Sequence, residues 1–424
     1  MTQEPRIPLF EMIMCLSNAM DLVSPHVVDH HKRVAYIAAS IAAEMGLSEA
    51  EQEDILMAGI VHDIGAISLK DRLDGLRFES EHPHAHAELG YRLIRSFETF
   101  ARIAPIIRFH HVPWERGKGA RFRGERVPIV SHILHLSDRI AVLINPKKEV
   151  LGQAKGVIEI VTGGAEVLFI PELLDSFVTL AKKEYFWFDA VSSFIGKILK
   201  DRTKLATIEL NLEGLLGLTK LFSKIIDFRS GFTASHSSGV AASAEALAGM
   251  VGLPLQDCGM IRIAGYLHDL GKLAVPAEIL EKPGRLTKEE NNIIKNHPYH
   301  TYRTLETVKD LGKIKVWASL HHECMNGKGY PFHFEAADIP LQSRIMAVAD
   351  VFTAITEDRP YRSGMSRSDA LSTLRQMAAN GELDPDLVAL LIFHYDSIND
   401  ARLEAQTSEY REYREFGGEA YLTN

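Results

Sequence analysis

The sequence predicts an all-α protein made of two tandem helical domains related by internal duplication. Residues 34–45 and 240–250 are rich in alanine, a strong helix former, and contain no proline. Gly46 and Gly252 lie close behind them, as glycines do at helix ends. No run of alternating β-branched residues indicates a sheet. The two segments also recur at one fixed distance along the chain.

A shift of the chain by 206 residues, the distance from His62 to His268, places 9–65 on 215–271 without a gap. The coincidences include His62-Asp63 with His268-Asp269, which chance matches of apolar residues would not give. The repeat continues to the late aspartates with the small changes of offset that loop insertions produce. We therefore expect an N-terminal domain over residues 1–200 and a C-terminal domain with a helical tail over 201–424. Each is long enough to bury its own core.

Composition limits the classes of function. The net charge of −9 gives no global attraction for polymeric nucleic acid, so a small anionic ligand would need a local cluster of Arg and Lys. The three cysteines form no CxxC pair, which argues against a thiolate zinc site and fits a reducing cytoplasm. The N-terminus does not resemble a signal peptide, and no apolar run of about 18 residues predicts a membrane span. We expect a cytoplasmic protein.

Histidines and aspartates of the C-terminal half form a pattern typical of a metal site. Imidazole and carboxylate without thiolate suit catalytic iron, manganese, nickel or zinc better than a structural zinc. The set is larger than one ion needs, and a carboxylate such as Asp269 could bridge two ions. The candidate ligands are His236, His268, Asp269, His297, His321, His322 and Asp350.

The same residues carry a resemblance to a known family. The run His-Asp-Leu-Gly-Lys at 268–272, together with the other ligands, resembles the HD phosphohydrolase superfamily. The run Asn-Gly-Lys-Gly-Tyr-Pro at 326–331 matches the signature of the HD-GYP family, and 339–362 is also similar to it. The resemblance covers about 215–400. It implies HD-type helical domains, and a phosphodiesterase of bacterial second-messenger signalling that hydrolyses cyclic di-GMP to pGpG and/or GMP.

The resemblance also implies roles for single residues. One ion would be held by His236, His268, Asp269 and Asp350, and the other by Asp269, His297, His321 and His322. A hydroxide bridging the ions would attack phosphorus. Lys272 would contact the scissile phosphate and assist the leaving oxygen, and Arg359 and Arg362 would grip phosphates. Tyr330 and Pro331 would shape the mouth of the site and offer a surface to a protein partner.

Two departures from the family pattern affect these expectations. Phe232 stands where some members carry a glutamate that binds a third metal, so we expect two divalent ions, with iron or manganese favoured over nickel or zinc. Thr353 stands where an aspartate is common, so one polar contact is absent or altered.

The N-terminal half contains a second candidate metal site but lacks the other catalytic parts. Ala66 replaces the lysine, no Gly-Tyr-Pro follows, and the paired arginines are absent, although Lys147 and Lys148 lie nearby. His26 could be an extra ligand. This half resembles an HD domain without the GYP signature, which could regulate, act on another phosphate or retain its histidines as relics. Its candidate ligands are His30, His62, Asp63, His82, His110, His111 and Asp138.

Three alternatives stay open at this point. The tandem architecture also resembles enzymes that act on 3',3'-cyclic GMP-AMP, so the bases are undecided. A non-catalytic cyclic dinucleotide receptor belongs to another class, and Lys272 with the full ligand set argues against it. A di-iron oxygenase is opposed by the Tyr-Pro loop and the two arginines. The charged tail 403–424 is expected to be a fraying surface helix or to pack on a second subunit of a homodimer.

Overall fold

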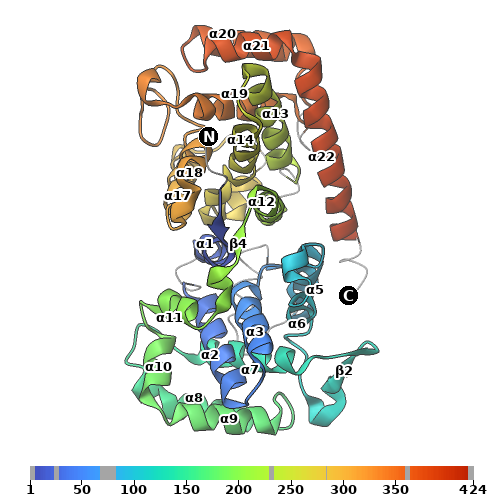
Figure 1. The fold of residues 1–424 in the computed structure, drawn as a ribbon, viewed down its shortest axis with the longest axis vertical. Coiled ribbons are helices and arrows are strands. Elements are labelled where there is room, and N and C mark those ends of the chain that lie inside the picture. Colours follow the sequence, from blue (N-terminus) through green and yellow to red (C-terminus); the bar gives the residue numbers. More distant parts are fainter. Residues whose placement is uncertain are drawn as a thin grey trace. The chain divides into compact units, whose positions relative to one another are not determined.

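The computed structural model describes residues 5–22, 28–66, 83–228, 234–282, 284–358 and 363–418. The chain divides near residue 208 into two compact units, one formed by Pro8–Ile208 and one that starts at Glu209 and includes the residues up to Ile7. Each unit is a bundle of helices (Figure 1). The only strands in the described residues are four of two residues each. The prediction of an all-α fold is confirmed.

The N-terminal unit is built around helix α2, His30–Glu44, which is buried along nearly its whole length. Helices α3 and α7 pack directly against it. The elements of this unit are α1 (Leu9–Asp21), α3 (Glu49–Val61), α5 (Pro83–Ile94), α6 (Ala104–Arg108), β2 (Arg121–Phe122), β3 (Glu125–Arg126), α7 (Ile129–Leu143), α8 (Leu151–Gly163), α9 (Pro171–Ala181), α10 (Glu184–Ala190) and α11 (Ile195–Asp201), with short 3-10 turns between them.

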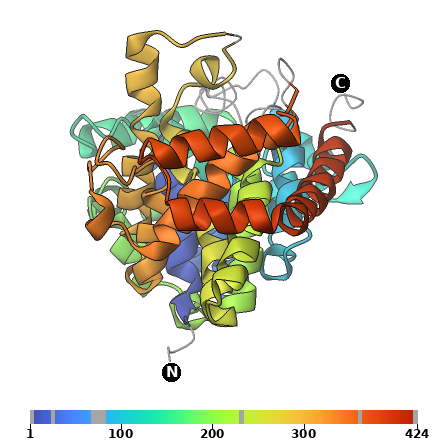
Figure 2. The ribbon, with the colours of Figure 1, turned by 90° about the horizontal axis from the view of Figure 1, so that it is seen from above.

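The C-terminal unit is built in the same way around α13, His236–Val251, which packs against α14, α19 and α22. Helices α20 and α21 lie side by side at one end of this unit (Figure 2). Its elements are β1 (Ile7–Pro8) paired with β4 (Glu209–Leu210), α12 (Leu212–Asp227), α14 (Leu255–Leu267), the 3-10 helix η4 (Leu270–Ala274), α15 (Ala277–Leu280), α16 (Lys288–Ile294), α17 (His297–Leu305), α18 (Gly312–Ser319), α19 (Leu341–Thr356), α20 (Arg367–Ala379), α21 (Pro385–Phe393) and α22 (Tyr395–Gly418).

The repeat extends to the packing of the helices that carry the candidate ligands. A Cβ atom on Gly59 of α3 would lie 2.6 Å from the Cα of Ala35 in α2. A Cβ atom on Gly265 of α14 would lie 2.5 Å from the Cα of Ala241 in α13. Only glycine permits so close an approach, so each pair of helices meets at the same point. The first histidine and the His-Asp pair are thereby brought together in both units.

The tail helix α22 differs from the expected fraying surface helix. It lies along α13, and its polar side chains Arg402, Gln406 and Glu409 are buried. A buried polar side chain must find hydrogen-bonding partners, so these residues tie α22 into the bundle. The part of α22 up to Glu409 therefore packs into the C-terminal unit through this buried face.

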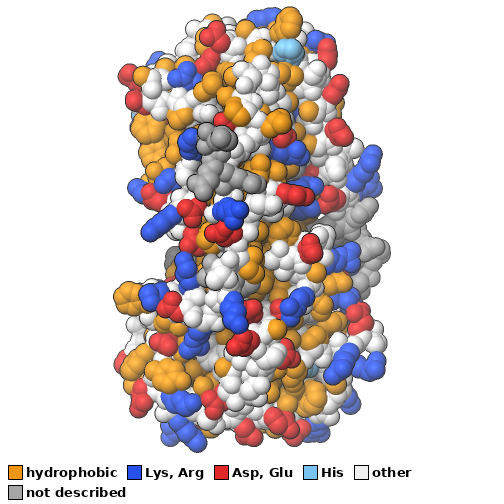
Figure 3. All heavy atoms as spheres, in the orientation of Figure 1, with side chains coloured by type: hydrophobic (Ala, Val, Ile, Leu, Met, Phe, Trp, Pro, Cys, Tyr) orange, Lys and Arg blue, Asp and Glu red, His pale blue; other side chains and the backbone are white. Residues whose placement is uncertain are grey.

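The surface carries both signs of charge. Basic and acidic side chains are interspersed on the face shown in Figure 3. Among the described helices, none combines the length and the apolar character needed to cross a bilayer.

Candidate metal centres

The turn after α14 positions the His-Asp pair of the C-terminal unit. His268 caps α14, and its Nδ1 donates to the carbonyl oxygen of Gly265 at 2.7 Å. The ring therefore directs Nε2 toward Asp269, whose Oδ2 lies 3.2 Å away. Thr301 of α17 donates to the carbonyl oxygen of His268 at 3.0 Å and accepts from the backbone N–H of Gly271 at 2.9 Å. These two bonds fix α17, which carries His297, against the turn.

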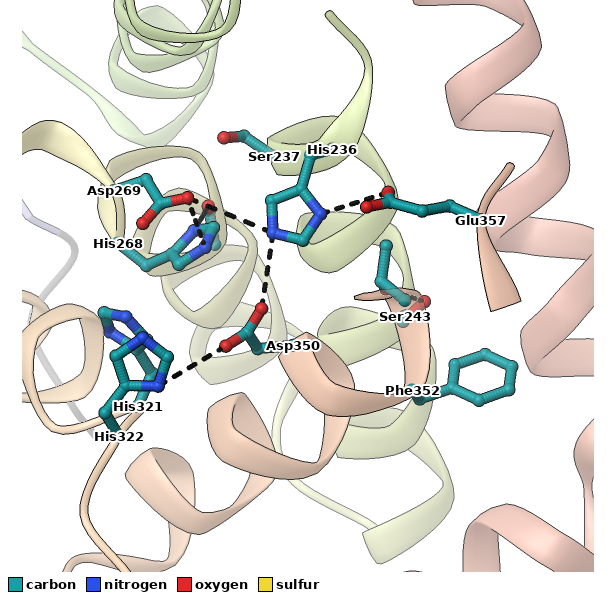
Figure 4. A network of polar contacts seen from close by, with 12 residues as sticks. His236, Ser237, Ser243, His268, Asp269, His321, His322, Asp350, Phe352 and Glu357 are labelled. Atoms are coloured by element: carbon teal, nitrogen blue, oxygen red, sulfur yellow. Dashed lines mark hydrogen bonds and ion pairs between the residues drawn. The ribbon is translucent and has the colours of Figure 1, made fainter. Parts of the chain in front are cut away.

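The structure brings all seven C-terminal candidate ligands together, and all of them except His297 are labelled in Figure 4. His236 Nε2 lies 3.3 Å from Asp350 Oδ1, and His268 lies within the same group. On the other side of Asp269, His297 Nε2 lies 3.4 Å from Oδ1. His321 and His322 complete that second group. The carboxylate of Asp269 thus has one oxygen in each group.

The ring nitrogens of His297 and His321 fit a bound cation. Each Nδ1 lies 2.7 Å from a backbone carbonyl oxygen, which can only accept, so each Nδ1 carries the proton. Burial lowers the pKa of His297 to about 3 and that of His321 to about 4, so both rings are neutral near pH 7. Their Nε2 atoms, 3.2 Å apart, then present two facing lone pairs. Such an arrangement is repulsive until a positive ion lies against both nitrogens.

Lys272 and the Gly-Tyr-Pro loop lie on the accessible side of this cluster. The side chain of Lys272 is 23% exposed, and its Nζ lies 2.5 Å from Asp269 Oδ2. The ring of Tyr330 packs on His322 with the centroids 4.8 Å apart. Glu323 accepts from the backbone N–H of Phe332 at 2.7 Å, which folds Pro331 and the following residues back against the His-His pair. The loop therefore borders the site.

Several residues singled out from the sequence lie outside the described residues. These residues are His26, His82, Phe232, Arg359 and Arg362. Thr353, in the place of the common aspartate, is buried, and its hydroxyl lies 3.5 Å from that of Ser243. The altered contact at this position is therefore one between two hydroxyl groups.

The N-terminal unit contains a second cluster of the same design. His30 Nε2 lies 3.2 Å from Asp138 Oδ1, and His62 Nε2 lies 3.4 Å from Asp63 Oδ2. The other oxygen of Asp63 lies 3.3 Å from His86 Nε2. His110 and His111 join this second group. As in the other unit, one aspartate has an oxygen in each of two groups.

Sequence reasoning missed His86, which occupies the place expected for His82. His86 Nε2 lies 2.9 Å from Nε2 of His111, the second histidine of its pair, whereas His297 Nε2 lies 3.2 Å from Nε2 of His321, the first histidine of its pair. A signal was available: the pairs His110-His111 and His321-His322 are 211 residues apart, and the same offset relates His86 to His297. The prediction of His82 came from matching His82-Pro83 to His297-Pro298 at an offset of 215, and His82 lies outside the described residues.

The two clusters differ in the cation that touches them. In the C-terminal unit Lys272 contacts Asp269, and Ala66 stands at the repeat position. In the N-terminal unit Arg139 contacts Asp138 at 2.5 Å, and its side chain is only 3% exposed. The N-terminal cation is therefore buried against a different carboxylate, and sequence reasoning did not identify it.

Glu357 is a second residue that sequence reasoning missed. It follows α19, and its Oε2 lies 3.1 Å from His236 Nδ1 (Figure 4). It is buried, with 6% of its surface exposed. In the sequence it adjoins Asp358 and cannot be told from an ordinary solvated charge.

Comparison with known proteins identifies the family. Residues 220–387 and 27–143 each match a family described as HD domain. The chain is 30% identical over 398 residues to the 3'3'-cGAMP-specific phosphodiesterase 1 of Vibrio cholerae, covering 92% of both chains. The chain belongs to the HD-GYP family of cyclic dinucleotide phosphodiesterases. It contains two HD domains in tandem.

Other relatives of this HD-GYP protein divide by how much of the chain they match. The 3'3'-cGAMP-specific phosphodiesterase 3 of V. cholerae is 24% identical and covers 91% of this chain and 94% of its own. A cyclic di-GMP phosphodiesterase of Pseudomonas aeruginosa is 41% identical over 158 residues, 37% of each chain. The crystal structure of the V. cholerae cyclic GMP-AMP phosphodiesterase V-cGAP3 has a TM-score of 0.63 at 22% identity, covering 93% of this chain and 98% of its own, which shows a shared fold.

Proposed function

We propose that the C-terminal centre hydrolyses a phosphodiester bond of a cyclic dinucleotide with two divalent metal ions. One observation carries the proposal. The two oxygens of Asp269 lie 3.2 Å from His268 Nε2 and 3.4 Å from His297 Nε2, so a single carboxylate faces two groups of ligands. This is the arrangement that a pair of metal ions needs for phosphoester hydrolysis.

The ligands of the centre are assigned to two metal ions. The ions, when bound, would neutralise charge on the phosphate and make a water acidic enough to be a nucleophile near neutral pH. The first would be held by His236, His268 and Asp350, the second by His297, His321 and His322, with Asp269 shared. Iron or manganese suits these imidazole and carboxylate ligands.

Lys272 is the candidate for contact with the phosphate. Its side chain is 23% exposed at the accessible side of the cluster, so its ammonium group can reach a substrate and donate to a phosphate or leaving oxygen. Arg359 and Arg362 are proposed to hold the remaining phosphate oxygens through bidentate contacts. Tyr330, which packs on His322, would border the bound dinucleotide.

For the N-terminal unit we propose a metal centre that does not hydrolyse the dinucleotide. Its proposed ligands are His30, His62, Asp63, His86, His110, His111 and Asp138. The unit has Ala66 in the place of Lys272, and Arg139 is buried against Asp138 and cannot reach a substrate. On this division, residues 1–200 form a regulatory domain and residues 201–424 the catalytic domain.

The substrate is either 3',3'-cyclic GMP-AMP or cyclic di-GMP. The relatives that match more than nine tenths of the chain are named for 3'3'-cGAMP. Relatives named for cyclic di-GMP match 37% and 40% of the chain at higher identity. Because the tandem arrangement is shared with the former group, we propose 3',3'-cyclic GMP-AMP as the first substrate to test. We also propose that the protein acts in the cytoplasm, because its sequence has only three, widely spaced cysteines, which fits a reducing compartment.

The decisive experiment is turnover of both dinucleotides by the full chain. The protein is purified without oxygen and loaded with Fe(II) or Mn(II), and linear dinucleotide and mononucleotide products are separated by chromatography. We expect hydrolysis that needs the metal and stops with a chelator. Tight binding of a dinucleotide without turnover, in protein shown to contain metal, would instead identify a receptor.

A further inference from the structure

His236 is oriented differently from His268, His297 and His321 of the same centre. The Nδ1 atoms of His268, His297 and His321 each face the backbone carbonyl oxygen of the residue three positions earlier, at 2.7 Å. His236 is the first residue of α13, and its Nδ1 faces the Glu357 carboxylate at 3.1 Å. The Glu357 side chain, at the end of α19, therefore determines that His236 turns its Nε2 toward Asp350.

Helix α22 holds that carboxylate in place. Gln406 donates its Nε2 to the same oxygen of Glu357 at 3.1 Å. Arg402, one turn earlier, donates to the side-chain oxygen of Gln406 and to Asn399 Oδ1, the latter at 2.9 Å. Glu357, Arg402 and Gln406 are 6%, 3% and 9% exposed. A buried chain of polar groups thus runs from the tail helix to His236.

The backbone of α13 is shaped to admit this contact. A Cβ atom on Gly239 would lie 2.8 Å from the amide carbon of Gln406. A larger residue would have to push the amide of Gln406 aside, so the glycine leaves room for Gln406 to reach Glu357. Helices α13 and α22, which are far apart in the sequence, therefore pack closely next to His236.

We propose that Glu357 and Gln406 are positioning residues that set His236 for metal binding, which makes α22 part of the metal centre. A carboxylate that accepts the Nδ1 proton fixes the tautomer, leaves Nε2 for the ion and makes that nitrogen more basic. The carboxylate can do so only if its own position is fixed, which the Gln406 amide achieves. This inference rests on the proposed function of the C-terminal centre.

The contact of a buried carboxylate with the first histidine is found in the C-terminal unit. Asp138 and Asp350 are repeat partners, and the same offset relates Glu357 to Asn145. Asn145 is exposed, and its side chain accepts from the backbone N–H of Lys147 at 3.0 Å. Substitution of Asn145 is therefore a matched control, because the residue has the equivalent place in the chain without a buried contact.

The experiment measures the affinity of the full-length protein for Mn²⁺ by competition with a chromogenic chelator. The variants are E357A, E357Q, Q406M, the double variant E357A/Q406M and the control N145A. For E357A we expect the ion that His236 helps to hold to bind about 10–100-fold less tightly. E357Q, which still accepts the Nδ1 proton, should lose only a few-fold. N145A should match the wild type.

Kinetics and the double variant test the link through α22. We expect Q406M to weaken Mn²⁺ binding less than E357A, and E357A/Q406M to equal E357A, because Gln406 acts through Glu357. In turnover assays kcat should fall while KM for the dinucleotide changes little. E357Q and Q406M keep the side-chain volume, so they give the answer if E357A does not fold.

The possible failures can be told apart. Absence of Mn²⁺ from the C-terminal centre of the wild type would refute the proposed function itself. Wild-type affinity in folded E357A would refute the positioning role while leaving the metal centre intact. Losses that multiply in the double variant would show that Gln406 does not act through Glu357.

Discussion

The carbonyl oxygen of His297 lies 1.9 Å from the place that a Cβ atom would take on Gly271. In the N-terminal unit, the carbonyl oxygen of His86 lies 2.1 Å from the same place on Gly65. The glycine two residues after each aspartate therefore lets the helix with the third histidine rest directly on the His-Asp turn. The spacing of the two ligand groups depends on this contact.

Substitution of Gly271 by alanine should displace α17 and weaken the second ligand group. The expected loss of stability is at least about 1–3 kcal/mol, as for other overpacked cores. Thermal unfolding and metal content of the purified variant measure the two effects. The matched control is Gly249→Ala in α13, where a Cβ meets nothing within 4 Å and alanine favours the helix. Equal behaviour of the two variants would show that the contact is unimportant.

Substitution of Asp269 by alanine should remove both hydrolysis and metal loading in the C-terminal unit. The reason is that each of its oxygens faces one ligand group, so its loss affects both. Metal analysis and turnover are measured on protein whose fold is checked by circular dichroism. Near-normal turnover would contradict the two-metal proposal.

Equivalent histidines of the two units should give unequal effects. We expect His268→Ala to abolish hydrolysis of the cyclic dinucleotide and His62→Ala to leave much of it, because only the C-terminal unit has Lys272 on its accessible side. Turnover is compared alongside the metal content of the C-terminal centre. If folded His62→Ala protein keeps those metals and is as inactive as His268→Ala, the N-terminal unit is catalytic or obligatory for catalysis.

The choice between His82 and His86 can be made by metal analysis. In an Asp269→Ala background, where only the N-terminal centre is left, His86→Ala should lower the metal content because His86 faces Asp63 and His111. His82→Ala should keep it. A loss of metal in His82→Ala alone would restore the assignment made from the His-Pro match.

Joint substitution of Arg359 and Arg362 by alanine should weaken substrate binding and leave metal binding unchanged. Each lost charge-assisted contact costs about 1.5–3 kcal/mol, so affinity should fall at least tenfold. Calorimetry with a dinucleotide on a hydrolysis-deficient variant measures the change, and metal content is the control. Unchanged affinity would mean that neither arginine contacts the phosphates.

Much of this architecture could be predicted because the duplication repeats polar residues. His62-Asp63 and His268-Asp269 recur with their flanking glycines, and a repeated polar pattern is far less ambiguous than an apolar one. The helical fold and the grouping of the seven C-terminal ligands follow from that pattern and the family resemblance. The structure adds the distances that place Asp269 between two groups.

The parts that could not be predicted depend on contacts between distant segments. Gln406 reaches Glu357 from 49 positions further along, in a helix whose sequence is mostly polar, so neither residue carries a local signal. Arg139 follows directly on Asp138 and looks like a helix-surface charge until its burial is known. Three histidines within 82–86 likewise left two candidates, His82 and His86, for the third N-terminal ligand.

The packing of α22 against α13 determines where this protein can be truncated to give a folded C-terminal fragment. The HD match of the C-terminal unit ends at residue 387, before α22 begins at Tyr395. A fragment trimmed to that match would keep every proposed C-terminal ligand. It would, however, expose the surface of α13 around Gly239, which α22 covers, and remove the Gln406 amide that donates to Glu357. The smallest autonomous fragment of the C-terminal unit therefore has to extend at least through Glu409, whose carboxylate accepts a hydrogen bond from Ser238 on α13.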